Sequence, residues 1–129
     1  TIKKSDNADG DVIVKNSQSV FKLTSVDGII IDGLELNSSD SYGIEIKGYS
    51  NDLYFQNLNI ESSGDGIASE DDIGNFALMN SIILSHTDDG VDINKDVNNV
   101  IIDDVQVQAS DNVMKFDKGV NGDMNISKL

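Results

Sequence analysis

Residues 43–60 read GIEIKGYSNDLYFQNLNI, and this stretch shows how the chain is built. Its apolar residues alternate with other residues in three pairs, which are Ile44 and Ile46, Leu53 and Phe55, and Leu58 and Ile60. Alternation of this kind is typical of short β-strands, because successive side chains point to opposite faces of a strand. Residues 49–52 (YSND) and Asn57 separate the pairs and favour turns. The stretch therefore predicts three short strands joined by tight turns.

The same pattern recurs along the chain at a nearly constant interval. The first apolar residue of successive units stands at Phe21, Ile44, Ile67, Val91 and Met114, so the intervals are 23, 23, 24 and 23 residues. Three strands in each repeat predict an all-β fold, a right-handed parallel β-helix of about five coils in which each coil bonds to the next. An antiparallel sandwich of short strands is the rival interpretation, but sandwiches do not repeat in register like this.

One position of the repeat carries only residue types that tolerate a left-handed backbone. It is occupied by Gly33, Asn57, Asn80 and Asp104. Glycine, asparagine and aspartate are the residues that most readily adopt a positive φ. We therefore expect a sharp corner at this position, between the second and third strands of each coil.

The composition limits the partners of the chain. Its 129 residues contain 23 Asp and Glu but only nine Lys and no Arg, which gives a net charge of −14. Such a surface argues against nucleic acid and against an anionic membrane as partners, and no apolar run reaches the length of a membrane span. An acidic polymer could bind only where a divalent cation reversed the local charge.

The two ends of the chain do not read as polar caps. The last segment, DMNISKL (123–129), stops in the middle of a coil. Uncapped coils expose strand edges, which favour association. We therefore expect residues 1–129 to form a single β-helix domain that belongs to a longer chain, or one that associates with copies of itself, end to end or laterally.

Residues 86–94 read HTDDGVDIN and concentrate carboxylates in one turn and the strand that follows it. Stacking of the coils places Asp65, from the preceding coil, beside Asp88, Asp89 and Asp92. Four carboxylates form a hard oxygen cage that suits Ca²⁺ better than Mg²⁺ or Zn²⁺, and the single histidine excludes a histidine-based zinc site. Asp-Asp-Gly is also ordinary turn sequence, so solvated corners are the alternative interpretation.

Lys115 lies one coil beyond Asp92, on the outer face of the predicted strand. It could form a surface ion pair of little energetic value. It could also act as a base, if a nearby cation lowered the pKa of its amine. Residues 19–23 (SVFKL) nearly repeat residues 112–116 (NVMKF), so the local sequence is partly typical of the β-helix itself. Proximity to the aspartates is what distinguishes Lys115 from Lys22.

Three segments in successive coils carry a resemblance to a known family: SSGDGI (62–67), DDGVDI (88–93) and NVMKFD (112–117). Their order resembles that of the calcium-dependent pectate lyases of polysaccharide lyase family 9. The resemblance implies that Asp65, Asp88, Asp89 and Asp92 bind Ca²⁺ and that Lys115 is the Brønsted base. It further implies β-elimination on pectate or another acidic polysaccharide, by a secreted or cell-surface bacterial protein. Asn112 and Val113 depart from the family's pattern, which has glycine before the lysine.

Two other functions remain open. Asp65-Gly66-Ile67 followed by Asp88-Asp89 resembles the paired aspartates of polygalacturonase-type glycoside hydrolases, although Ser110-Asp111-Asn112 stands where those enzymes carry Gly-His-Gly. A β-helix of this size could instead be a non-catalytic, carbohydrate-binding or adhesive segment of a surface protein.

Overall fold

The computed structural model describes residues 1–4 and 12–129. Within these ranges the chain consists of strands and turns. The strands are β1 (Ile2–Lys3), β2 (Ile13–Asn16), β3 (Phe21–Thr24), β4 (Asp27–Asp32), β5 (Glu35–Ser38), β6 (Ile44–Lys47), β7 (Asn51–Gln56), β8 (Asn59–Ser62), β9 (Ile67–Ser69), β10 (Ile73–Ser85), β11 (Val91–Ile93), β12 (Val97–Gln108), β13 (Met114–Phe116) and β14 (Met124–Ser127). The described residues include no helix long and apolar enough to cross a membrane.

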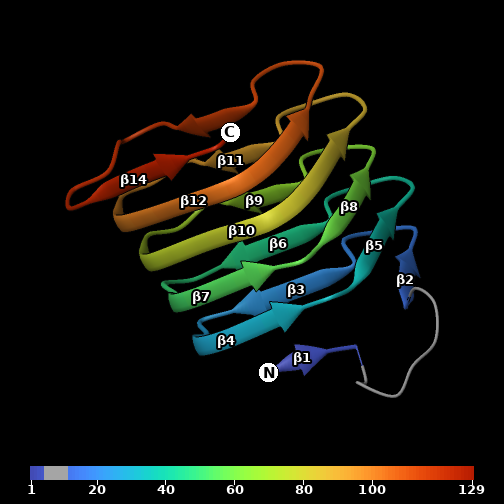
Figure 1. Cartoon of the computed structure of the whole chain (residues 1–129), viewed down its shortest axis with the longest axis horizontal. Coiled ribbons are helices and arrows are strands. Elements are labelled where there is room, and N and C mark those ends of the chain that lie inside the picture. The colour runs from blue at the N-terminus through green and yellow to red at the C-terminus, as the bar shows by residue number, and fades with distance from the viewer. Residues whose placement is uncertain (5–11) are drawn as a thin grey trace.

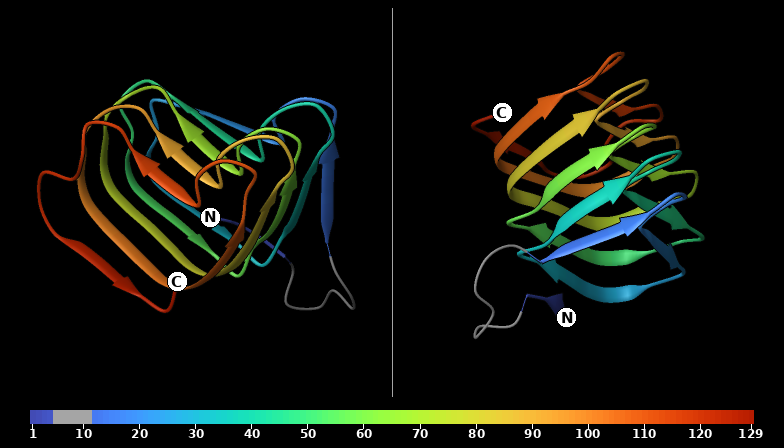
Figure 2. Two further views of the ribbon diagram at one scale, coloured as in Figure 1. Left: turned by 90° about the horizontal axis from the view of Figure 1, so that it is seen from above. Right: turned by 90° about the vertical axis from the view of Figure 1, so that its right-hand side faces the viewer.

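The strands stack into a right-handed parallel β-helix of about five coils, as the repeat predicts (Figure 1). One sheet contains β3, β6, β9, β11 and β13 in that spatial order. The other contains the remaining nine strands and forms two sides of each coil (Figure 2). Every strand pairing is parallel, because equivalent strands of successive coils run in the same direction.

The register of the sheets confirms the alignment of the repeats. Ile67 pairs with Ile44 on one side and with Val91 on the other. In the larger sheet, Phe76 pairs with Leu53 and Val100. Residues at the same position of successive coils therefore lie one above another, which is what brings side chains from different coils together.

The corner of the larger sheet forms at the predicted position. Gly33, Asn57, Asn80 and Asp104 have φ values of 71°, 54°, 44° and 53°. The structure differs from the prediction of three separate strands in two coils, where β10 and β12 continue through the corner. A single left-handed residue turns the chain there, and pairing resumes at once, from Met79 with Asp103 to Ser81 with Val105.

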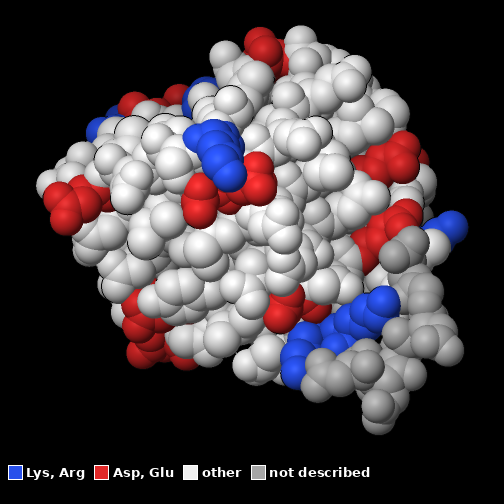
Figure 3. All heavy atoms as spheres, viewed as in Figure 1, with Lys and Arg blue, Asp and Glu red and all other residues white. Residues whose placement is uncertain are grey.

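The apolar core fills the interior of the coils. Phe55 and Phe76, at neighbouring levels, contact each other edge to face with ring centroids 5.8 Å apart. Ile31, Ile44 and Leu78 are among the side chains that are fully buried around them. Figure 3 shows the outer side of the larger sheet, where acidic side chains lie in separate small groups on a mostly uncharged surface.

Candidate metal centre

The candidate centre lies where long turns enter the five-stranded sheet. Gly66 and Gly90 precede β9 and β11, and their backbones lie very close together. A Cβ added to Gly66 would lie 2.6 Å from the carbonyl oxygen of Gly90, and one added to Gly90 would lie 2.5 Å from that of Val113. Only glycine fits such an approach, so the two turns stack tightly and their aspartates are brought together.

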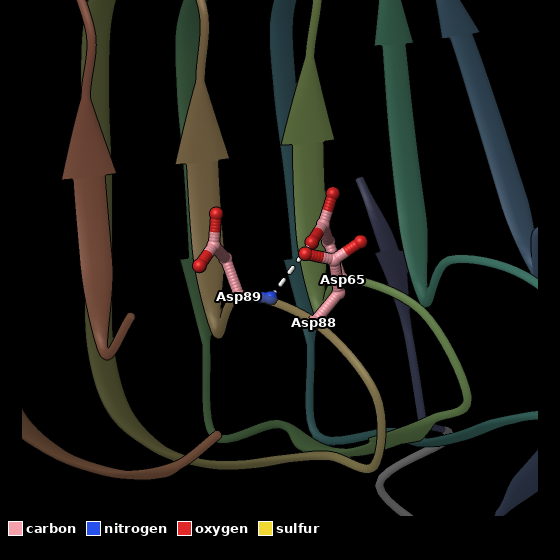
Figure 4. Close-up of side chains that lie close together, drawn as sticks. All are labelled: Asp65, Asp88 and Asp89. Carbon is pink, nitrogen blue, oxygen red and sulfur yellow. Dashed lines mark hydrogen bonds between the residues drawn. The ribbon is translucent and has the colours of Figure 1, made fainter. Parts of the chain in front are cut away.

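Asp65, Asp88 and Asp89 each offer a carboxylate oxygen, and these oxygens lie within 4.8 Å of one another. Figure 4 shows the carboxylates of Asp65 and Asp88 together at the start of β9, with that of Asp89 at the start of β11. Asp65 and Asp89 are 5% and 2% exposed, whereas Asp88 is open to solvent. A cation could therefore reach the group from the side of Asp88.

Asp65 and Asp89 are held in place by hydrogen bonds between successive coils. The backbone N–H of Asp89 donates to Oδ1 of Asp65 at 2.9 Å. Asn112 donates to Oδ1 of Asp89 from its backbone N–H at 2.7 Å and from its side-chain amide at 2.8 Å. The second oxygen of each carboxylate takes no part in these bonds, and that of Asp89 instead faces the amine of Lys115 at 3.8 Å.

Asp92, the fourth predicted ligand, lies beside the group of three and faces Lys115. Its Oδ1 is 3.4 Å from Nζ of Lys115, but this buried atom accepts no hydrogen bond from the described residues. Nζ of Lys115 also lies 3.8 Å from Oδ2 of Asp89 and 3.6 Å from Oδ2 of Asp117. The structure therefore brings Lys115 next to the predicted metal ligands, one coil away, as the sequence predicts.

Burial, together with the crowding of the carboxylates, changes their ionisation. The pKa of Asp65 is raised to about 6, mainly by burial. The hydrogen bond from the backbone N–H of Asp89 lowers this pKa, whereas the charges of Asp88, Asp92 and Asp89 raise it further. Burial also raises the pKa of Asp92, and Lys115 offsets only part of that rise. A bound cation would relieve this repulsion, since it favours the charged form of each carboxylate.

The same carboxylates act on Lys115 in the opposite direction. Burial lowers the pKa of its amine, but the interactions with Asp92, Asp117 and Asp89 outweigh burial, so the pKa is raised overall. The amine is therefore held in its protonated form while the charges of these carboxylates are not neutralised.

The donor set fits a hard divalent cation. It consists of carboxylate oxygens, which suit Ca²⁺. The only histidine, His86, is directed elsewhere, because its Nε2 lies 2.9 Å from Oε1 of Glu61. The buried Oδ1 of Asp92, whose neighbour is the amine of Lys115 at 3.4 Å, supplies one more acceptor at the edge of the group.

Sequence reasoning missed a hollow beside these residues. A cavity of about 130 Å³ lies over Ala68 and is bounded by Asp65, Asp88 and Asp92 on one side and by Tyr42 and Lys47 on the other. The sequence indicates this hollow at one position of the repeat, where residues of successive coils pair and form a column. The column contains one small residue between charged ones: Lys22, Glu45, Ala68, Asp92 and Lys115.

Comparisons with known proteins assign neither a family nor a function, since no protein-family model, curated protein or solved structure matches the chain.

Proposed function

We propose that this β-helix binds Ca²⁺ through Asp65, Asp88 and Asp89, with Asp92 as a fourth ligand, and cleaves an acidic polysaccharide by β-elimination with Lys115 as the base. The observation that carries the proposal is the convergence of three carboxylate oxygens within 4.8 Å, with an amine 3.4 Å from Asp92 and 3.8 Å from Asp89. The resemblance of residues 62–67, 88–93 and 112–117 to family 9 polysaccharide lyases supports it. Secretion or display at a bacterial cell surface belongs to the same proposal.

The chemistry divides between the cation and the chain. Asp65, Asp88, Asp89 and Asp92 would hold Ca²⁺, which would supply the positive charge that makes the hydrogen on C5 of a bound uronate unit more acidic. Lys115, neutral once the cation offsets the charges of Asp92 and Asp89, would accept the proton from C5 as the bond from C4 to the glycosidic oxygen breaks. The leaving oxygen takes up a proton, and a double bond forms between C4 and C5. Asp92 and Asp89 would orient the amine for this transfer.

The test is incubation with polygalacturonate and Ca²⁺ while the ultraviolet absorbance of the unsaturated product is followed. We expect absorbance to rise with the wild-type protein and not with Lys115→Ala. Lys118→Ala is the matched control, because it removes the same charge from an exposed residue of the same coil. Full activity of Lys115→Ala would contradict its role as the base, and activity that survives chelation would contradict the role of the metal.

A hydrolase is the second candidate, because one observation favours it. A carboxyl group with a pKa of about 6, such as Asp65, suits a general acid. However, the carboxylate oxygens lie within 4.8 Å of one another, which is closer than the roughly 6.5–9.5 Å between the carboxyl groups of an inverting pair. New reducing ends without unsaturated product, formed in the presence of a chelator, would favour the hydrolase. Calcium-dependent binding of the polymer without any cleavage would favour an adhesive or carbohydrate-binding segment.

A further inference from the structure

The hollow over Ala68 is lined by residues of three successive coils. Ala68 lies in the middle of β9, and its neighbours in the column are Glu45 on β6 and Asp92 on β11. Because adjacent strands are about 4.8 Å apart, the backbones of Glu45 and Asp92, two strands apart, are separated by about 10 Å. The short side chain of Ala68 leaves the space between them open, so a ligand held at the metal centre could extend into it.

Glu45 is paired with two lysines at the far edge of this hollow. Its Oε1 lies 3.0 Å from Nζ of Lys47, and its Oε2 lies 3.3 Å from Nζ of Lys22. The hydroxyl of Ser19 also donates to Oε2, at 3.0 Å. The Glu45 carboxylate is therefore fully satisfied, and two ammonium groups face one buried carboxylate. The three side chains, from two neighbouring coils, together carry one excess positive charge, and Glu70 also acts on the Lys47 amine electrostatically.

Lys47 is the lysine that borders the hollow. Its side chain is 53% exposed, so its head can be reached by a ligand. An ammonium group has three donors, and the bond to Glu45 uses one of them. Lys47 can therefore bind a second carboxylate without giving up its partner.

Tyr42 forms the adjoining wall. Its ring lies against Gly64 of the next coil, where an added Cβ would be 3.2 Å from the ring carbon Cδ1. Burial raises the pKa of the Tyr42 hydroxyl, and the carboxylates of Asp65, Glu45 and Glu70 raise it further, so the hydroxyl keeps its proton and can donate. Glu70 and Asn94, which also border the hollow, add acceptors for sugar hydroxyls.

From this arrangement we propose that the hollow over Ala68 is a subsite for a second uronate unit, whose carboxylate is bound by Lys47 and whose ring lies beside Tyr42. The inference rests on the proposed function, because the neighbouring unit is the one held at the metal centre. It assigns the ligand a direction, across the coils from β11 towards β6. It also makes Lys47 a specificity-determining residue that takes no part in bond cleavage.

The test compares Lys47→Ala, Lys47→Arg and Lys15→Ala with the wild-type protein. Lys15, on β2, is an exposed lysine outside the five-stranded sheet, so Lys15→Ala is a control for the loss of one positive charge. Binding of a galacturonate hexamer in the presence of Ca²⁺ is measured by calorimetry, and cleavage by the absorbance of the product. A methyl-esterified hexamer, with one free carboxylate left for the metal centre, serves as the ligand without a second charge.

We expect Lys47→Ala to weaken binding of the hexamer about tenfold, as for the loss of one partly exposed charge-assisted hydrogen bond. KM should rise by a similar factor with little change in kcat, because the contact is the same in the ground state and the transition state. Lys47→Arg should restore most of the affinity, and Lys15→Ala should bind as the wild type does. The methyl-esterified hexamer should not distinguish Lys47→Ala from the wild type.

Two results would overturn this subsite. One is equal affinity of Lys47→Ala and wild type for the charged hexamer, and the other is an equal loss of affinity for both hexamers. Failure of the proposed function looks different, because the wild-type protein itself would then neither bind nor cleave the hexamer with Ca²⁺.

Discussion

Asp65 is the residue in which the conflict between charge and burial is clearest. Burial and three neighbouring aspartates raise its pKa from 3.8 to about 6. A carboxyl group whose pKa is higher in the folded state than in the unfolded state favours folding below the unfolded value. That contribution is lost as the pH rises through the folded value.

This gives a prediction for the metal-free protein. With a chelator present, the free energy of unfolding of Asp65→Asn should rise relative to that of the wild type as the pH increases from about 3.8 to about 6. Asparagine keeps an oxygen that can accept the hydrogen bond from the N–H of Asp89. Urea unfolding of both proteins across this pH range measures the difference. A constant difference would show that Asp65 ionises in the same way in the folded and unfolded states.

The same aspartates predict how the metal affects stability. At a Ca²⁺ concentration one hundred times the dissociation constant, binding should stabilise the wild-type protein by about 2.7 kcal/mol. Asp89→Asn should lose most of this effect, because its carboxylate is 2% exposed and belongs to the group of three.

Thermal unfolding with Ca²⁺ and with chelator measures this effect. Asp96→Asn is the control, since Asp96 is exposed in the turn after β11 and lies outside the group. An equal rise in Tm with Ca²⁺ for wild type and Asp89→Asn would exclude the proposed centre.

The sequence predicts which residues of the site lie at neighbouring levels, and it does not predict what their side chains contact. The repeat places Asp92 opposite Lys115, and the structure confirms that pairing. It could not show that Asp92 would face the amine while Asp65, Asp88 and Asp89 converge, because that choice depends on side-chain rotamers. The subsite at Lys47 was missed for the same reason.

Among the elements, the corners are the most predictable part of the fold. Asn80 lies inside β10 with a φ of 44°, and its side-chain amide donates to Asn57 of the preceding coil. The residue type alone predicts the bend, since few other residues accept this conformation. The continuity of β10 through the bend depends on pairing with β12 and could not be read from local sequence.

Substitutions of Asn80 test whether the left-handed backbone at this corner determines which residues it accepts. Asn80→Val should destabilise the protein by about 1–2 kcal/mol, because a β-branched residue is strained at a left-handed φ. Asn80→Gly should change the stability little, apart from the loss of the side-chain hydrogen bond to Asn57, because glycine adopts this conformation without strain. Equilibrium unfolding in urea measures both. Equal destabilisation by valine and glycine would mean that the hydrogen bond from the Asn80 side chain to Asn57, and not the backbone conformation, accounts for the loss of stability.

The turns before β9 and β11 give a second prediction at this scale. Gly66→Ala should destabilise the protein by about 1–3 kcal/mol, because the new methyl group would meet the backbone of Gly90 at 2.6 Å. It should also weaken Ca²⁺ binding, since it pushes apart the turns that carry Asp65 and Asp89.

Gly28→Asn is the matched control for Gly66→Ala. Nothing lies within 4 Å of a Cβ at position 28, and its φ of 78° is one that asparagine tolerates. Unfolding by urea and titration with Ca²⁺ test both variants. A Gly66→Ala protein as stable as Gly28→Asn would contradict the close approach of the turns.

In the whole molecule, a net charge of −14 is distributed over about five coils. Mutual repulsion between these charges opposes the compact state. Raising the NaCl concentration from about 0.01 M to about 0.15 M shortens the screening length from about 30 Å to about 8 Å. We therefore expect the Tm of the metal-free protein to increase with NaCl. A Tm that falls over this range would show that attractive ion pairs, such as those of Glu45 and Lys115, outweigh the repulsion.

The stacked register also limits how such a protein can change over time. Each coil contributes 23 or 24 residues and pairs with the next at equivalent positions. Duplication or loss of one complete coil would leave each remaining side chain facing the core or the solvent as before. It would shift all later residues by a single strand spacing of about 4.8 Å. The distance between two binding groups on this scaffold can therefore be lengthened or shortened in equal steps, which would allow related proteins to select polymers of different repeat length without redesigning the core.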